Sequence, residues 1–129
     1  MATTDTIRQT IWEDASVALM ARITGADGTA IAQADVSTIT YAVYDTHSTT
    51  KNTATTSGSV VVADDVFDTL QTDSRWSVDS TGYNFRHDIA ATVFTVGGHV
   101  YEVEYKFTAA TAEVYWVVFE LDVKPVRTS

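Results

Sequence analysis

Cysteine is absent from the 129-residue sequence, which excludes disulfide bonds and any chemistry that depends on a thiol. Secreted domains of this size more often carry disulfides, so we expect a protein that is made and assembled inside a cell. Proline is nearly absent as well, and its one occurrence, Pro125, follows the last predicted strand, where a missing N–H ends strand pairing.

Two kinds of targeting segment are also missing from the sequence. The N-terminus has no basic start followed by an apolar run, so we expect no signal peptide. No apolar stretch approaches the roughly 18 residues that a membrane-spanning helix needs. We therefore expect no membrane partner.

Basic residues are few, with 8 Lys and Arg against 17 Asp and Glu, which gives a net charge of −9. Such a chain would repel phosphate groups instead of neutralising them, so we expect no nucleic-acid partner. An anionic membrane surface is disfavoured for the same reason. The acidity itself indicates a role in solubility.

Recognisable catalytic motifs are missing too: the sequence has no G-x-S-x-G elbow, phosphate-binding loop or dinucleotide fingerprint. Glu102 and Glu104 share one face of a predicted strand, roughly 7 Å apart, which is a spacing that acid/base pairs can use. Outward glutamates on such a strand are ordinarily solvated, and Lys106 lies beside them. We therefore predict a protein that is not an enzyme, has no catalytic residues and needs no cofactor.

The strongest pattern present is a strict alternation of apolar and polar residues in the last third of the chain. It runs through residues 100–108 and, after a short connection at 109–112, through residues 113–123. A period of two is typical of half-buried strands and predicts a β-hairpin with two long arms. The apolar positions of this hairpin are Tyr101, Val103, Tyr105, Phe107, Tyr115, Val117, Phe119, Leu121 and Val123.

Shorter alternating segments precede the hairpin, at residues 15–24, 36–45, 59–63 and 83–89. Polar residues 46–58 predict an exposed loop, and residues 64–79, which lack a clear period, predict a helical turn with a packed loop. These elements favour an all-β fold, and we predict an immunoglobulin-like antiparallel β-sandwich of about seven strands with a short helical insert. We expect the sandwich at 15–124, an extended N-terminal arm at 1–14 and a C-terminal tail at 125–129.

Two sets of residues could suggest a metal site. The three histidines form no H-x-H or H-E-x-x-H motif, and no cysteine can join them. The aspartates of the 64–79 segment could hold calcium, but they lack the spacing of an EF-hand loop, and such aspartates mostly cap turns. We predict no metal site from either set. The residues concerned are His47, His87, His99, Asp64, Asp65, Asp68, Asp73 and Asp79.

The tryptophans are the last group of candidates. Trp116 shares one face of its strand with Val114 and Val118, opposite the face that the hairpin pattern buries. A strand that is apolar on both sides is expected where its outer face is covered, either by the chain's own arm or insert or by another subunit. For the second alternative we predict a partner contact at Trp116. We predict further partner contacts at Ile7, Ile11 and Trp12 of the N-terminal arm and at Val126 of the C-terminal tail.

Four segments of the chain resemble small structural proteins encoded in the morphogenesis regions of tailed bacteriophages. The segments are WEDASVAL from Trp12, VFDTLQTDSRW from Val66, VDSTGYNFRH from Val78 and GHVYEVEYKF from Gly98. The opening strand, the turn at Asp27 and Gly28 and the Y-x-V-x-Y-x-F strand are also similar to the N-terminal sandwich module of phage baseplate upper proteins. These are strand patterns and bring no catalytic residues with them.

The resemblance implies a non-enzymatic virion protein of the capsid decoration, or cement, type, which is assembled in the host cytoplasm and located in the virion. Its implied partners are the major capsid protein or other virion subunits. Because trimers are common among cement proteins, a homo-trimer is implied as well. Two alternatives remain open: a neck, tail or baseplate subunit, and a carbohydrate-binding surface module built on the tryptophans.

Overall fold

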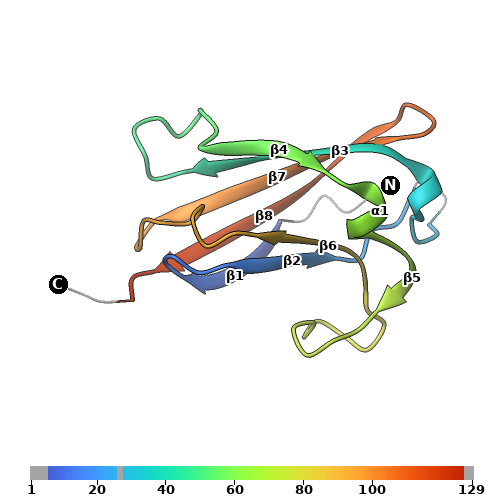
Figure 1. Ribbon diagram of the computed structural model, residues 1–129, viewed down its shortest axis with the longest axis horizontal. Helices are drawn as coiled ribbons and strands as arrows, with labels where there is room; N and C mark the ends of the chain where they lie inside the picture. The colour runs from blue at the N-terminus through green and yellow to red at the C-terminus, as the bar shows by residue number, and fades with distance from the viewer. Residues whose placement is uncertain (1–5, 26–27, 127–129) are drawn as a thin grey trace.

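The computed structural model describes residues 6–25 and 28–126, and these form two β-sheets packed face to face (Figure 1). The larger sheet has the strand order β1-β8-β7-β3-β4, and the smaller has the order β2-β6-β5. A 3-10 turn, η1 (Gln33–Asp35), precedes β3, and a four-residue helix, α1 (Val62–Asp65), separates β4 from β5. The strands are β1 (Ile7–Trp12), β2 (Val17–Ala21), β3 (Val36–Asp45), β4 (Thr56–Val60), β5 (Val66–Gln71), β6 (Tyr83–Ile89), β7 (Val100–Ala109) and β8 (Val114–Lys124).

The predicted all-β sandwich with a short helical insert is thereby confirmed. The predicted hairpin forms the centre of the larger sheet, where β7 and β8 pair antiparallel with Val103 opposite Phe119 and Phe107 opposite Tyr115. All of the apolar positions that the alternating pattern singles out in this hairpin are buried. The pattern predicted the inward face correctly because β7 and β8 pair with each other without a register shift.

The core lies between the two sheets and is dominated by aromatic side chains. Phe85 of the smaller sheet meets Tyr105 and Phe107 of the larger one edge to face, with ring centroids 5.1 and 5.2 Å apart. Tyr105 also meets Phe119, with centroids 5.7 Å apart. Each such pair adds about 0.5–1.5 kcal/mol beyond the burial of its area. These contacts hold the two sheets together and so fix which side of the larger sheet is turned outward.

One polar side chain, that of Asn84, is built into the interior at 1% exposure. Its Oδ1 accepts a hydrogen bond from the Ile23 N–H at 2.8 Å, and its Nδ2 donates to the carbonyls of Ile23 at 2.9 Å and Ile31 at 3.3 Å. The Asn84 amide therefore takes the place of a neighbouring strand for the backbone groups of Ile23 and Ile31, where the chain turns after β2. Its hydrogen bonds compensate for the desolvation of these backbone groups.

Residues 7–12 form a strand that the sequence did not predict. β1 pairs with β8 in parallel, with Ile7 opposite Phe119 and Ile11 opposite Val123, and it is the only parallel pair among the described strands. Ile7 and Ile11 turn toward the core, but the polar Gln9 between them interrupts the alternation. Two apolar residues four positions apart suit a helix as well as a strand, so the pattern was uninformative.

The 56–71 region differs from the sequence prediction in two ways. β4 covers residues 56–60 where residues 59–63 were expected, because its polar and glycine-containing sequence carries no alternation. β5 occupies Val66–Gln71, where we predicted a helical turn and a packed loop. Its register shifts between Val66, which pairs with Phe85, and Gln71, which pairs with Tyr83. A bulge of this kind breaks the period of two on which the prediction depended.

The predicted arm and tail are described only in part. Residues 1–5 of the arm, residues 127–129 of the tail and Asp27 of the predicted turn lie outside the described residues. Within the described part, residues 7–12 of the predicted arm belong to the larger sheet of the same chain.

Candidate functional site

The larger sheet has one face turned away from the smaller sheet, and we call this its outer face. Along β7 and β8, buried side chains alternate with side chains that are exposed or half-buried, and the second set forms the outer face. The sequence left open whether the chain's own arm or insert covers these residues. β1 lies beside β8 at the edge of the same sheet, and β5 of the insert belongs to the smaller sheet. Neither element therefore lies over the outer face.

An apolar strip on the outer face consists of Val114, Trp116 and Val118, which alternate along β8. Val114 is 46% exposed and Trp116 is 51% exposed, and Val118 is half-buried. Lys106 of the neighbouring strand β7 lies opposite Trp116, with its Nζ 6.0 Å from the centre of the indole ring. A cation at that distance stabilises an exposed ring by about 0.5–1 kcal/mol. The tryptophan is therefore held in place while much of its surface stays in contact with water.

The other predicted contact residues have different environments. Ile7 and Ile11 pack partly buried against the core of their own chain. Trp12, opposite Lys124, is 60% exposed, and Val126 after β8 is 64% exposed. Of the five residues predicted to contact a partner, Trp12, Trp116 and Val126 thus remain largely accessible.

The three tryptophans do not share one surface. Trp12 of β1 pairs with Lys124 of β8, and Trp116 precedes Lys124 by eight residues on β8. At 3.4 Å per residue, Trp12 and Trp116 are therefore roughly 27 Å apart. Trp76 lies in the loop between β5 and β6, in contact with Tyr83 of the smaller sheet. Trp12 and Trp116 are therefore too far apart to contact one sugar ring together.

Two glutamates of the outer face share a pocket. Their side chains lie on the same side of β7, and a hydrogen bond that protonated Glu104 donates to Glu102, together with burial, raises the pKa of Glu104 to about 7. Glu104 therefore keeps its proton, which it donates to Glu102, until the pH approaches neutrality. The pocket measures about 400 Å³ and is lined by Tyr44, Thr46, Lys51, Asn52, Glu102 and Glu104.

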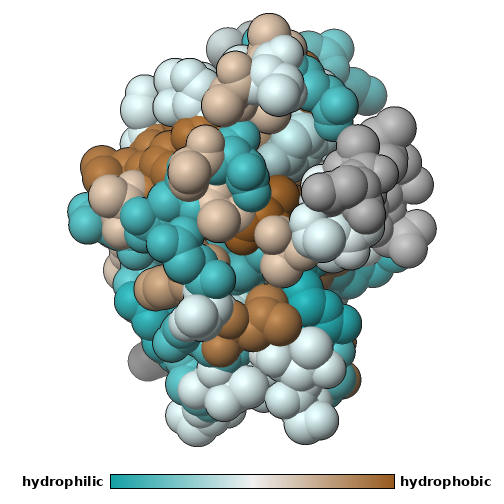
Figure 2. Space-filling view, turned by 90° about the vertical axis from the view of Figure 1, so that its right-hand side faces the viewer, coloured by the Kyte–Doolittle hydropathy of each residue, from teal (hydrophilic) through white to brown (hydrophobic). Residues whose placement is uncertain are grey.

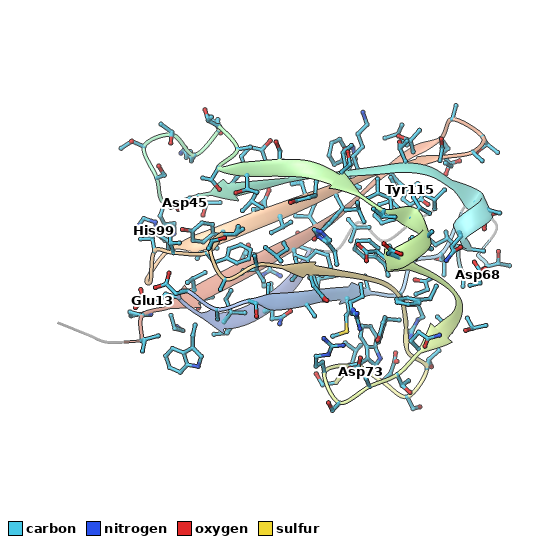
Figure 3. All side chains as sticks on the ribbon, in the orientation of Figure 1. Glu13, Asp45, Asp68, Asp73, His99 and Tyr115 are labelled. Atoms are coloured by element: carbon cyan, nitrogen blue, oxygen red, sulfur yellow. The ribbon has the colours of Figure 1, made fainter. Side chains whose placement is uncertain are left out.

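Glu13 ties three segments together at one end of the sandwich (Figure 3). Its carboxylate accepts hydrogen bonds from the N–H groups of Gly97 at 3.2 Å and Val126 at 3.0 Å. The next residue, Asp14, donates its N–H to the carbonyl of Phe94 at 2.8 Å. The ends of β1 and β8 and the connector before β7 are thereby fixed relative to one another, which also fixes where Trp12 and Val126 are presented.

Two of the three histidines come together at this same end. Asp45, the last residue of β3, is buried, and both of its carboxylate oxygens lie within 2.9 Å of His99 Nδ1. The rings of His99 and His47 have centroids 5.5 Å apart. No local sequence pattern predicts this group, because Asp45 and His99 are 54 residues apart and come together only when β3 pairs with β7.

His87 lies apart from the other two, on the inward side of β6. Its Nδ1 lies 2.7 Å from the hydroxyl of Tyr105, and its ring is 4.7 Å from that of Tyr41, centroid to centroid. Burial lowers the pKa of His87 and raises the pKa of Tyr105, so both groups remain neutral around pH 7. This pair satisfies two polar groups inside the sandwich.

The aspartates that were weighed as calcium ligands organise a loop instead. Asp79 Oδ1 accepts hydrogen bonds from the indole of Trp76 and from the N–H groups of Thr81 and Gly82. Asp73 accepts from the Tyr83 hydroxyl and from the Arg75 backbone and side chain. Among the described residues, no group of three or more His, Asp or Glu side chains is arranged to hold a metal ion.

A second surface pocket, of about 350 Å³, lies at the opposite end, next to the turn between β7 and β8. Its lining includes Ile31, Asp35, Ala109 and Tyr115. Figure 2 looks onto this end of the molecule and shows its apolar surface divided into separate areas by polar side chains. The apolar residues at this end therefore do not form one continuous surface in that view.

Comparison of the chain with protein-family models, with curated proteins and with solved structures found no match. Across residues 6–25 and 28–126, no helix has the length and apolar content needed to cross a membrane.

Proposed function

We propose that the chain is a non-enzymatic structural subunit of a tailed-bacteriophage particle, a capsid decoration protein that binds the major capsid protein through its outer face. The observation that carries the proposal is the uncovered apolar strip, in which Trp116 is 51% exposed between two valines. The resemblance of the sequence to phage structural proteins supports the same function.

The energetics of the strip favour a binding role. Tryptophan is enriched among the residues that dominate protein–protein affinity, because it buries a large area with few rotatable bonds. Covering the exposed half of Trp116, on the order of 100 Å², would contribute about 2–3 kcal/mol at 25 cal/mol per Å². One such contact is weak, but many copies on a shell that each bridge neighbouring subunits gain strength through avidity.

The rest of the outer face suits a protein that stays soluble before assembly. Glu102 lies opposite Glu120, and Arg8 of β1 forms an ion pair with Glu120 at 3.4 Å. These charged groups lie next to the Val118 end of the apolar strip and limit association through the strip alone. We infer that a productive contact needs a capsid surface with apolar and basic groups in matching positions.

Binding of purified variants to particles that lack the protein tests the proposal. Trp116→Ser should reduce the amount bound at least tenfold, since a loss of about 1.4 kcal/mol already corresponds to that factor. Val78→Ser is the matched control, because Val78 is 70% exposed and lies in the loop attached to the smaller sheet. Unchanged binding by Trp116→Ser, with the fold intact by circular dichroism, would contradict docking through this face.

A carbohydrate-binding surface module is a second candidate, and the pocket of Glu102 and Glu104 favours it. An aromatic ring from Tyr44, the amide of Asn52 and two carboxyl groups could together bind sugar hydroxyls. A glycan array probed with the unmodified chain and with Tyr44→Ala tests this candidate. Binding to a glycan that Tyr44→Ala abolishes would favour it over the decoration proposal, and an array without signal would count against it.

A further inference from the structure

Asp45, His47 and His99 form a polar group that the sequence did not predict and that the proposed function does not use. β3 ends at Asp45, His47 follows in the turn, and His99 lies just before β7 (Figure 3 shows Asp45 and His99 side by side). Asp45 and His99 are 54 residues apart in the sequence and are brought together by the pairing of β3 with β7.

Asp45 fixes the orientation and the tautomer of His99. Its two carboxylate oxygens lie 2.9 and 2.8 Å from His99 Nδ1, and the side chain is only 8% exposed. A carboxylate can only accept hydrogen bonds, so Nδ1 carries the proton. In neutral His99 the lone pair is therefore on Nε2. A histidine that donates Nδ1–H to a buried carboxylate is the arrangement by which proteins orient metal-binding imidazoles.

His47 is positioned beside His99 by the same carboxylate. The backbone N–H of His47 donates to Asp45 Oδ1 at 3.0 Å, which fixes the start of the turn. The two imidazole rings are 5.5 Å apart between centroids and inclined at 47°. A metal ion held at roughly 2.0–2.1 Å by two imidazole nitrogens at near-tetrahedral angles places the ring centroids about 5–5.5 Å apart. The observed separation agrees with that value.

In contrast to the sequence-based prediction of no metal site at the histidines, we propose that His47 and His99 form a two-imidazole site for a divalent transition-metal ion of the zinc class, with Asp45 as the carboxylate that orients His99. Imidazole nitrogen suits zinc, nickel and copper ions and not calcium or magnesium, which take oxygen ligands. His47 is exposed and the His99 side chain is 32% exposed, so an ion can reach the site from solvent. Water or a donor from a neighbouring molecule completes the coordination.

The whole-chain charge supports cation binding at this site. A net charge of −9 raises the local concentration of cations near the surface, and Asp45 adds a fixed negative charge directly behind His99. The proposal is independent of the capsid assignment, because it depends only on residues at the junction of β3 and β7.

Zinc titration of the untagged full chain, followed by NMR of the histidine rings, tests the proposal with an internal control. Zn²⁺ should shift the ring resonances of His47 and His99 and saturate at one equivalent. His87, which is hydrogen-bonded to Tyr105 in the interior, should not respond. Ca²⁺ at the same concentration should leave all three rings unchanged. Ring resonances of His47 and His99 that do not move with Zn²⁺ would overturn the proposal.

Variants separate the roles of the three residues, with affinity for Zn²⁺ and Ni²⁺ measured by calorimetry. His47→Ala removes a ligand and keeps the backbone hydrogen bond to Asp45, so binding should be lost. Asp45→Asn should weaken binding about 10–100-fold, as expected when the carboxylate behind a metal-binding histidine is replaced. His87→Gln is the control and should bind like the unmodified chain. Full affinity in His47→Ala would overturn the site even if His99 variants prove unstable.

Discussion

Single carboxylates hold the loop between β5 and β6 in place. Asp79 accepts hydrogen bonds from Trp76, Thr81 and Gly82, and it also forms an ion pair with Arg22 at 2.8 Å. The pKa of Asp79 is lowered to about 2, and the largest cause is the hydrogen bond from the backbone N–H of Gly82. Hydrogen bonds from Arg75 and Tyr83 likewise lower the pKa of Asp73 to about 2.

These lowered pKa values predict the acid sensitivity of the loop. Because the folded state binds the proton more weakly than the unfolded state, the stabilisation by Asp79 is complete above its ordinary pKa of 3.8 and is lost as the pH falls through about 2. Carboxyl NMR titration should give a midpoint near 2 for Asp79, and the indole N–H signal of Trp76 should change with it. A midpoint near 3.8 would show that the hydrogen bonds do not form in solution.

Glu104 should behave in the opposite way. Its pKa is raised from 4.5 to about 7, so the folded state binds the proton more tightly than the unfolded chain does. The free energy of unfolding should therefore fall as the pH rises from about 4.5 to 7 and then level off. Glu104→Gln should flatten this part of the profile in urea unfolding measured from pH 4 to 8, and Glu113→Gln, at the exposed turn before β8, serves as the control. Identical profiles for Glu104→Gln and the unmodified chain would contradict the shared proton.

At the residue scale, the sequence predicted the character of many positions but not their contacts. The absence of a catalytic role for Glu102 and Glu104 remains a prediction, although their shared proton could not be foreseen. The i, i+2 spacing predicts how far apart two side chains lie on a strand, but it does not predict whether their carboxyl groups form a hydrogen bond with each other. The meeting of Asp45 with His99 has no local signal at all, because it depends on how two distant segments pair.

At the scale of elements, the place where Glu13 joins the ends of β1 and β8 to the segment before β7 depends on Gly97, which has no side chain. Gly97 lies so close to its neighbours that an added Cβ would stand 2.6 Å from Pro125 Cα and 2.7 Å from Glu13 Oε2. The ends of β1 and β8 and the connector before β7 can converge only because position 97 occupies so little space. Glycine here is required by a close approach of backbone to backbone.

Gly97→Ala should therefore destabilise the protein by about 1–3 kcal/mol, the usual cost of forcing extra volume into a packed site. Chemical denaturation of the two proteins measures this difference. Gly98→Asn is the comparison, since Gly98 has a φ of 87° but no other atom within 4 Å of an added Cβ, and asparagine tolerates this conformation. Equal stability of Gly97→Ala and the unmodified chain would show that the junction is looser than the structure indicates.

The elements that the sequence failed to predict share a physical cause. β1 contacts the core through Ile7 and Ile11 only, and β5 has a register shift between its two paired positions. Both strands are at sheet edges, where one side of the backbone has no neighbour and few side chains are buried. Alternation is strong only where a strand is buried along one whole face, which is why β7 and β8 were predicted closely and β1 and β5 were not.

At the scale of the whole molecule, the sequence was sufficient to predict the sandwich but not its orientation toward partners. The alternating pattern gives one inward face per strand, and the count of strands favours two sheets. Whether the second face of β8 is covered depends on where the arm and the insert go, and that is a property of the complete fold. In the described part of the chain, β1 of the arm and β5 of the insert lie elsewhere, and Trp116 remains accessible.

The copy number of the protein in purified phage particles tests the central claim most directly. Quantitative mass spectrometry against the major capsid protein gives this number without any assumption about the contact surface. A decoration protein should be present in numbers comparable to those of the capsid subunit. A handful of copies per particle would instead identify a neck, tail or baseplate subunit, and complete absence from the particles would contradict a virion role altogether.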